Sequence, residues 1–369
     1  MKRGSRVSRR EFSLARLFFM SCLLSGGLVY PAAAADRVVT SAATLLGEVV
    51  SMTPDALEFR EQGSAGRPRQ IPVDEIMSLV LESEPPRVTE ARRLLEQDDF
   101  QAAAAVLEEV SQVELDVASA AARGEYAYVK AAVVGRQALV SGNDSDLAVA
   151  TVTDFLDRFS RSIHRYEMIE LAGDLELAMG EREAALSRYR QLAKGPQSLA
   201  IRAARREGET LFELGRAAEA AIVLAAAADL PAGNSASRLE RTAAKIGEAS
   251  CLIRLTRPAE AADLIRRLLA TTEPPAATDE KGQRQVARAY ATLGRASLAA
   301  GRDQDALIAY LTVDLVHNQD QESHAEALFR LHELWNRGQY PQRANEAARR
   351  LEADYPESSW ASRLAQARD

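Results

Sequence analysis

The chain has 369 residues, of which 47% are hydrophobic, 5% aromatic and 27% charged, and its formal net charge is -7 at pH 7. This length is too great for one ordinary domain and suits two domains or a repeat array. The acidic balance argues against a protein that binds a nucleic-acid backbone, and an apolar fraction rich in alanine and poor in aromatic residues predicts closely packed helices.

Residues 1–35 have the composition of a signal peptide. Basic residues dominate the start, an apolar run extends from Leu14 to Tyr30, and a stretch of small residues ends at Ala35. This order is typical of a secretory leader, and the apolar run is short for a membrane span. We therefore expect cleavage after Ala35 and export to the periplasm.

Within the leader, Ser8-Arg9-Arg10-Glu11-Phe12 resembles the twin-arginine export motif. Ser13 departs from that motif, in which leucine is usual, so ordinary secretion stays open. Two further alternatives are an uncleaved leader that anchors the chain in the inner membrane, and lipidation at Cys22. No membrane span is expected in the mature chain, where Cys251 would be the only cysteine and a buried small hydrophobe.

Residues 37–84 predict a small all-β module. Apolar and polar residues alternate in four or five short runs, with turn residues at Thr53-Pro54-Asp55 and at Gly63–Gly66. Pro85-Pro86 ends the pattern, because proline cannot continue a strand ladder. We expect a hairpin sheet or an SH3-like barrel, which serves either as a docking module or as an N-terminal cap for the helices that follow.

From residue 87 to 369 the apolar spacing is helical, and pairs of glycines recur seven residues apart. The four pairs are Gly135 and Gly142, Gly173 and Gly180, Gly208 and Gly215, and Gly294 and Gly301. The second glycine of each pair suits the left-handed residue that ends a helix. The first lies within a helix, where glycine is unfavourable unless a neighbouring helix approaches closely. Both features are typical of helical hairpins.

A small residue follows each turn by about five positions, and a larger apolar residue comes four positions later. The clearest examples are Ala185 and Tyr189, Ala220 and Leu224, and Ala306 and Tyr310. This pattern resembles the tetratricopeptide repeat (TPR), although the usual tryptophan is missing. Degenerate units have Asp98, Thr256 or Gly338 at the turn. The resemblance implies an α-solenoid of seven hairpins over residues 87–369, with turns near 98, 142, 180, 215, 256, 301 and 338.

TPR arrays usually hold an extended peptide or a partner helix in a concave groove that is lined by the first helix of each hairpin. By the repeat register, the candidate groove residues are Arg202, Arg205, Glu209, Arg288 and Arg295. Arginines at these positions suit an acidic peptide or a terminal carboxylate. The alternative for each residue is a salt bridge within the array.

No residue pattern indicates catalysis. The segment beginning at His332 lacks the second histidine of a zinc-protease helix, and no phosphate-binding loop or nucleophile elbow occurs. We therefore expect no cofactor, no metal and no enzymatic activity. The hypothesis is a protein–protein interaction scaffold of the bacterial cell envelope, which binds other envelope proteins or peptides. The alternative is an accessory subunit or chaperone that presents substrate to an envelope enzyme or assembly machine.

Overall fold

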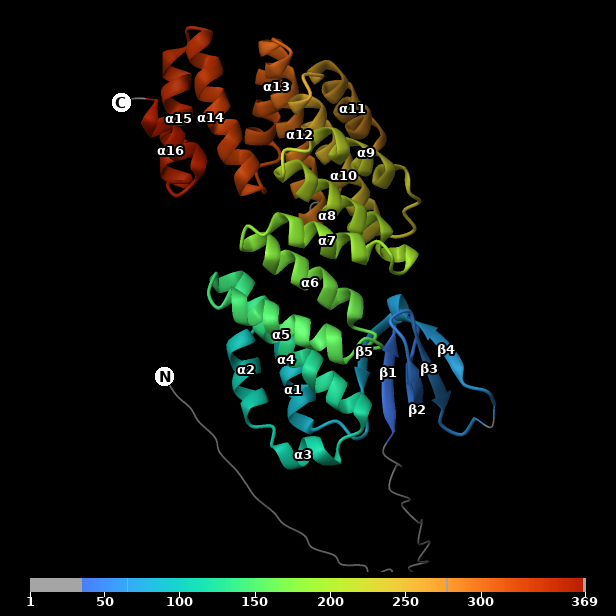
Figure 1. The fold of residues 1–369 in the computed structure, drawn as a ribbon. Coiled ribbons are helices and arrows are strands. Elements are labelled where there is room, and N and C mark those ends of the chain that lie inside the picture. The colour runs from blue at the N-terminus through green and yellow to red at the C-terminus, as the bar shows by residue number, and fades with distance from the viewer. Residues whose placement is uncertain (1–34, 65, 277, 368–369) are drawn as a thin grey trace, which may run out of the picture. The chain divides into compact units, whose positions relative to one another are not determined.

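The computed structural model describes residues 35–64, 66–276 and 278–367. The predicted leader lies outside the described residues, except for Ala35. The described residues form a five-stranded antiparallel sheet followed by sixteen α-helices (Figure 1). This confirms the predicted class, a TPR-like α-solenoid preceded by a small all-β module.

The sheet is open within the described residues and has the strand order β4-β3-β2-β1-β5. Its strands are β1 Asp36–Thr40, β2 Thr44–Met52, β3 Ala56–Glu61, β4 Arg69–Pro72 and β5 Ile76–Val80, with a 3₁₀ turn η1 Val73–Glu75 before β5. Strand β1 was not recognised in the sequence, because it is short and directly follows the leader. It is nevertheless the strand that joins β5 to the meander.

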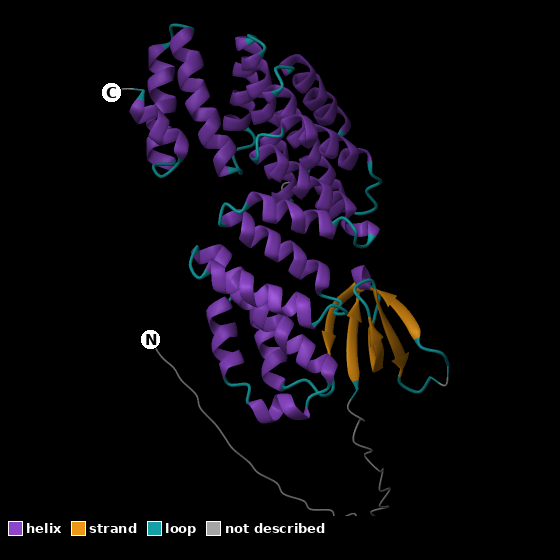
Figure 2. Ribbon diagram, viewed as in Figure 1, coloured by secondary structure: helices purple, strands orange, loops and turns teal. Residues whose placement is uncertain are grey.

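One face of the sheet packs against the start of the helical region (Figure 2). Leu57, Phe59 and Leu79 share an apolar cluster with Ala122 of α4 and with Ile163 from the loop before α6. Around this cluster, the Ser83 hydroxyl donates to the Ser119 hydroxyl at 2.8 Å, and the Tyr166 hydroxyl donates to Asp55 at 3.3 Å. The sheet buries its apolar face against helices, because so small a sheet cannot bury it alone.

The helices pair into seven hairpins that stack in chain order (Figure 1). The pairs are α1 Pro86–Glu96 with α2 Phe100–Glu108, α4 Ala120–Ser141 with α5 Ser145–Arg158, α6 Arg165–Ala178 with α7 Arg182–Leu192, α8 Ala200–Glu213 with α9 Ala217–Asp229, α10 Ser235–Arg254 with α11 Pro258–Thr271, α12 Glu280–Ala299 with α13 Asp303–Leu315, and α14 Gln321–Arg337 with α15 Pro341–Asp354. Three short helices complete the array: α3 Gln112–Val117, η2 Gln197–Leu199 and α16 Ser359–Gln366. None of the described helices combines the length and hydropathy that a membrane span requires.

Six of the seven hairpins turn through the same backbone motif. The left-handed residues are Asp98 (φ 59°), Gly180 (83°), Gly215 (80°), Thr256 (59°), Gly301 (71°) and Gln339 (63°). In each case the next backbone N–H donates to the carbonyl five residues before it, at 2.8–3.0 Å, as from Glu181 to Glu176. This is the Schellman motif, which satisfies carbonyls at a helix end. Gly338 itself is right-handed at φ -77°, and Gln339 takes the left-handed position.

A fully buried alanine lies five residues after each of these left-handed residues. These alanines are Ala103, Ala185, Ala220, Ala261, Ala306 and Ala344, and each has a relative exposure of 0%. The hairpin of α4 and α5 differs, because Gly142 (φ 71°) and Asp144 (φ 57°) are both left-handed and the buried alanine is Ala148. The turn and the alanine together set how closely the two helices of a hairpin approach.

The glycines within the first helices mark the same close approach. A Cβ atom added to Gly173, Gly208 or Gly294 would lie 2.8, 2.4 or 2.6 Å from the nearest atom of Tyr189, Leu224 or Tyr310, which is the large apolar residue of the second helix. A Cβ atom at Gly135 would instead lie 2.7 Å from Leu171 of the next hairpin.

We predict that Gly208→Ala destabilises the fold. Leu224 cannot move away, because a Cβ at Gly247 of the following hairpin would already lie 3.1 Å from its side chain. Overpacking costs about 1–3 kcal/mol, which outweighs the helix propensity of roughly 1 kcal/mol gained with alanine. Urea unfolding followed by circular dichroism measures the change.

Gly233→Ala is the control, because no heavy atom lies within 4 Å of a Cβ built there. An unchanged midpoint for Gly208→Ala would contradict the account of close helix approach.

Candidate functional site

The first helices of the hairpins, α1, α4, α6, α8, α10, α12 and α14, form a surface that we call the first-helix face. Two of the cavities that first helices line adjoin one another. A cavity of about 500 Å³, the β-side cavity, is lined by β5, α1, α4, α6 and the start of α8. A cavity of about 340 Å³, the cationic cavity, is lined by α8, α10 and α12. Arg202 lines both cavities, so they adjoin.

The structure brings four of the five predicted groove residues together. Arg202, Arg205 and Glu209 of α8 and Arg288 of α12 all line the cationic cavity. Arg295 lies outside this lining, and its guanidinium donates to Thr292 at 2.8 Å and lies 3.6 Å from Glu326. The predicted residues therefore converge on one place, with Arg295 apart from it.

Each of these arginines also has a carboxylate partner within the array. Arg205 pairs with Glu209 and with Glu240, and both partners raise the pKa of its guanidinium against the effect of burial. Arg202 lies 3.4 Å from Glu170, and Arg288 lies 2.9 Å from Asp320. The groove interpretation and the salt-bridge interpretation thus describe the same side chains.

The sequence analysis did not identify three further charged residues that line the cationic cavity: Glu240, Lys281 and Arg284. No glycine pair seven residues apart marks α10. In α12 the pair Gly294 and Gly301 lies well after Lys281 and Arg284, which directly follow the N-cap residue Asp279. The Asp279 side chain accepts a hydrogen bond from the Gly282 amide, a signal that would have identified the helix start. Lys281 has no ion-pair partner among the described residues.

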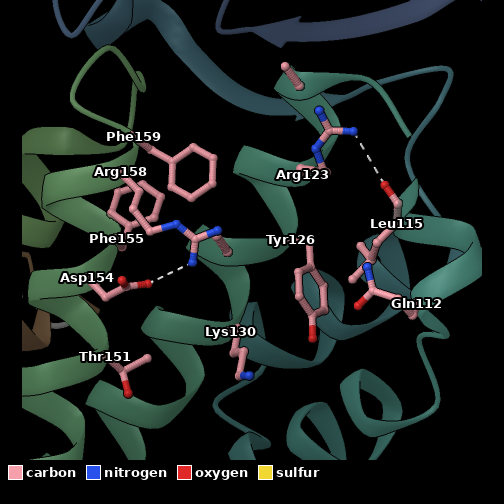
Figure 3. Close-up of a pocket in the computed structure, with 12 residues that line it drawn as sticks. Gln112, Leu115, Arg123, Tyr126, Lys130, Thr151, Asp154, Phe155, Arg158 and Phe159 are labelled. Atoms are coloured by element: carbon pink, nitrogen blue, oxygen red, sulfur yellow. Dashed lines mark hydrogen bonds and ion pairs between the residues drawn. The ribbon is translucent and has the colours of Figure 1, made fainter. Parts of the chain in front are cut away.

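A third cavity, of about 590 Å³, is lined by residues of α3, α4 and α5 and by Phe159, which directly follows α5 (Figure 3). Tyr126 and Phe155 contribute its apolar surface, and Lys130 and Arg158 lie at it. Arg158 pairs with Asp154 at 3.0 Å. Arg123 donates to the carbonyl of Ala118 at 2.6 Å, and so stabilises the chain between α3 and α4.

A buried charge network lies between the sheet and the first three hairpins. Glu84, from the segment that joins β5 to α1, accepts a hydrogen bond from Arg92 at 2.9 Å. Arg92 also donates to Glu125 of α4 at 3.1 Å, and Glu125 contacts His164 Nε2 at 3.1 Å. The His164 ring stacks on Tyr128 with ring centroids 3.5 Å apart. This network links the β module to α1, α4 and the start of α6.

His164 is a cation in the folded protein at neutral pH. Burial acts to lower its pKa, but Glu125 and Glu167 outweigh burial and raise the pKa to about 9. Arg136 in turn donates to Glu167 at 2.7 Å, and the Tyr128 hydroxyl donates to Glu167 at 3.0 Å. The charged groups in the network therefore neutralise one another, as in a structural ion-pair network.

No group of three or more His, Cys, Asp or Glu side chains that suits a metal ion occurs in residues 35–64, 66–276 and 278–367. His324 is packed between Asp314 at 2.9 Å and the Tyr355 hydroxyl at 2.7 Å, and His332 bonds to the Ala344 carbonyl at 2.9 Å. Cys251 is buried, which raises the pKa of its thiol to about 11.

No family model matches the sequence, and no curated protein matches it. Solved structures share its fold. A tetratricopeptide repeat protein from Parabacteroides merdae is 14% identical, is matched over 78% of this chain and 100% of its own, and has a TM-score of 0.56. The apo form of RapI is 12% identical over 75% of this chain and 79% of its own, with a TM-score of 0.56. The apo form of the quorum sensor NprR from B. thuringiensis is 12% identical over 74% of this chain and 76% of its own, with a TM-score of 0.51. At these identities the likeness shows the TPR-like fold alone.

We predict that the stability of the protein falls as pH rises through the pKa of His164. The unfolded chain loses this proton near pH 6.5, whereas the folded chain keeps it to about 9. The stabilisation is thus complete below pH 6.5 and is lost as pH rises through about 9, with a total loss of about 3 kcal/mol. Urea unfolding at pH 6, 7.5 and 9.5 measures it.

His164→Gln is expected to abolish this part of the pH dependence. His317→Gln is the matched control, because burial lowers the pKa of His317 and its titration lies below this range. If the free energy of unfolding of His164→Gln falls with pH as steeply as that of the wild type, His164 is not the source of the pH dependence.

Proposed function

We propose that the protein is a non-enzymatic scaffold that binds an acidic segment of a partner protein along the first-helix face. The fold supports a binding role, because a stack of hairpins presents one continuous surface built from successive first helices. The observation that carries the proposal is the charge of the cationic cavity. Five cationic side chains and two acidic ones line it, in a chain whose net charge is -7.

The exposure of these cations supports a ligand role. The side chain of Arg288 is 53% exposed and that of Arg284 is 51% exposed, and both project from α12. The pair of Arg284 with Glu280 is exposed on both sides and is worth about 0–1 kcal/mol, whereas Arg288 pairs with Asp320, whose side chain is only 7% exposed. A ligand carboxylate can therefore replace Glu280 at Arg284 at little cost, and Lys281, which has no ion-pair partner among the described residues, can pair with the same ligand.

We predict that hexaglutamate binds here. The probe is a fluorescein-labelled hexaglutamate peptide, titrated with the full chain at low salt and followed by fluorescence anisotropy. Lys281→Glu/Arg284→Glu is expected to weaken binding at least about tenfold, because the ligand then meets like charge in the cavity. Added salt weakens the wild-type complex in the same direction.

The matched control is Lys130→Glu/Arg158→Glu, which changes the net charge equally at the third cavity. It is expected to bind the peptide within about twofold of wild type. An equal loss in both double variants would show that only overall charge matters, and no binding to the wild type would refute the proposal.

We further propose that the chain acts in the periplasm after removal of its leader. The leader composition and the twin-arginine-like motif support export. The sheet supports cleavage after Ala35, because β1 begins at Asp36 and its carboxylate accepts hydrogen bonds from the Val49 amide at 2.7 Å and the Glu82 amide at 2.8 Å. A chain that starts at Asp36 keeps every strand. Partners would then be envelope proteins.

We predict that the exported protein starts at Asp36 and that Arg9→Lys/Arg10→Lys retains the precursor inside the cell. Cell fractionation and N-terminal sequencing in a bacterial host measure both. Export of the twin-lysine variant at the wild-type level would point to ordinary secretion. A full-length chain in the membrane fraction would point to an uncleaved anchor.

A further inference from the structure

The β module contributes an edge strand to the ligand-binding face. Strand β5 ends the sheet, and among the described residues its backbone pairs only with β1. Ile76, Met77 and Ser78 of this strand line the β-side cavity together with residues of α1, α4, α6 and α8. The sheet is thus one wall of a cavity whose other walls are first helices.

Met77 is directed outward by a bulge. Thr40 pairs with Ile76 and Val39 pairs with Ser78, so Met77 is an extra residue without a partner in β1. Its side chain is 70% exposed, although it lies in a cavity lining. Bulges re-aim side chains near binding sites, and methionine adapts to varied apolar partners.

The β-side cavity differs from the cationic cavity in its charge balance and in the exposed apolar residue Met77. Leu95, Ile163 and Leu199 contribute to its lining with Met77. Its charged residues balance: Arg92, Arg136, His164 and Arg202 against Asp74, Glu96, Glu167 and Glu170. The two adjoining cavities therefore differ in chemistry, since the β-side cavity offers the exposed Met77 without excess charge and the cationic cavity offers excess positive charge.

The two walls of the β-side cavity are held together before any ligand binds. The buried pairs of Arg92 with Glu84 and with Glu125 connect the end of the sheet to α1 and α4. Tyr166, which lines the cavity, also donates to Asp55 of the β module. A preformed site avoids the cost of ordering its parts on binding.

We infer that the β module is part of the binding site rather than only a cap. An extended segment of a partner protein places an apolar side chain against Met77 in the β-side cavity and its acidic side chains in the cationic cavity, with Arg202 at the junction. This inference rests on the proposed function and specifies its ligand. The occupant we infer is a protein segment, because a peptide can carry carboxylates that complement the five cations of the cationic cavity and, beside them, an apolar side chain for the exposed Met77.

The test uses hexaglutamate peptides that carry a Leu-Leu pair, joined through Gly-Gly at either the N-terminal or the C-terminal end. The matched peptides carry Ser-Ser instead. One leucine peptide is expected to bind the full chain about tenfold more tightly than its serine counterpart, because a leucine side chain is buried. Met77→Asp is expected to abolish this gain, and Met77→Ala to reduce it.

Leu46→Asp is the control, since Leu46 is a 50% exposed apolar residue of the same sheet outside these cavities. It is expected to keep the gain. If hexaglutamate binds but leucine adds nothing, or if the gain survives in Met77→Asp, the inference is overturned and the proposed function stands. If no peptide binds, the proposed function itself fails.

Methyl signals of ¹³C-labelled methionine locate the apolar group independently of folding defects in variants. The leucine peptide is expected to shift the Met77 signal and to leave the Met179 signal unchanged, because Met179 is 38% exposed at the end of α6 and lies outside both cavities. A shift of Met179 alone, or of neither signal on binding, would overturn the inference.

Discussion

The close approach of two helices within each hairpin is the constraint on which the rest of this structure depends. In six of the seven hairpins it combines a left-handed turn residue with an alanine, five positions later, that has no exposed surface. Asp98, Thr256 and Gln339 adopt the left-handed conformation without being glycine, at a cost of roughly 1–2 kcal/mol each. The Schellman hydrogen bonds and the burial of the alanine that follows offset this cost.

Stacking of such hairpins places equivalent residues of successive first helices beside one another. Ion pairs on the first-helix face accordingly join residues about one repeat apart: Arg202 with Glu170 over 32 positions, Arg205 with Glu240 over 35, and Arg288 with Asp320 over 32. The same arginines that connect neighbouring repeats therefore line the cavity. A salt-bridge role and a ligand role do not exclude each other where a pair is partly exposed, as for Arg202 with Glu170, whereas Arg288 also neutralises the buried carboxylate of Asp320.

The sequence predicts the features that recur in every repeat, but it does not predict binding residues that lie outside the repeat pattern. The glycine and alanine spacings identify all seven hairpins, and the helical register brings Arg202, Arg205, Glu209 and Arg288 to one cavity. Lys281 and Arg284 were not predicted, because they lie at the start of α12, which follows a long loop without periodic apolar residues. Met77 was not predicted for a different reason. A bulge interrupts the alternation of apolar and polar residues from which the two faces of a strand are deduced, and this bulge is evident only from the pairing of β5 with β1.

The buried network around Arg92 explains how a sheet of five short strands keeps a fixed position on the repeats. A buried ion pair adds little net stability, but removing one partner leaves a buried charge uncompensated. Glu84, Arg92, Glu125 and His164 come from the segment after the sheet, from α1, from α4 and from the loop before α6, so each is satisfied only when all four segments are in place. The network therefore selects one arrangement of the sheet and the hairpins, and this arrangement puts β5 at the edge of the first-helix face.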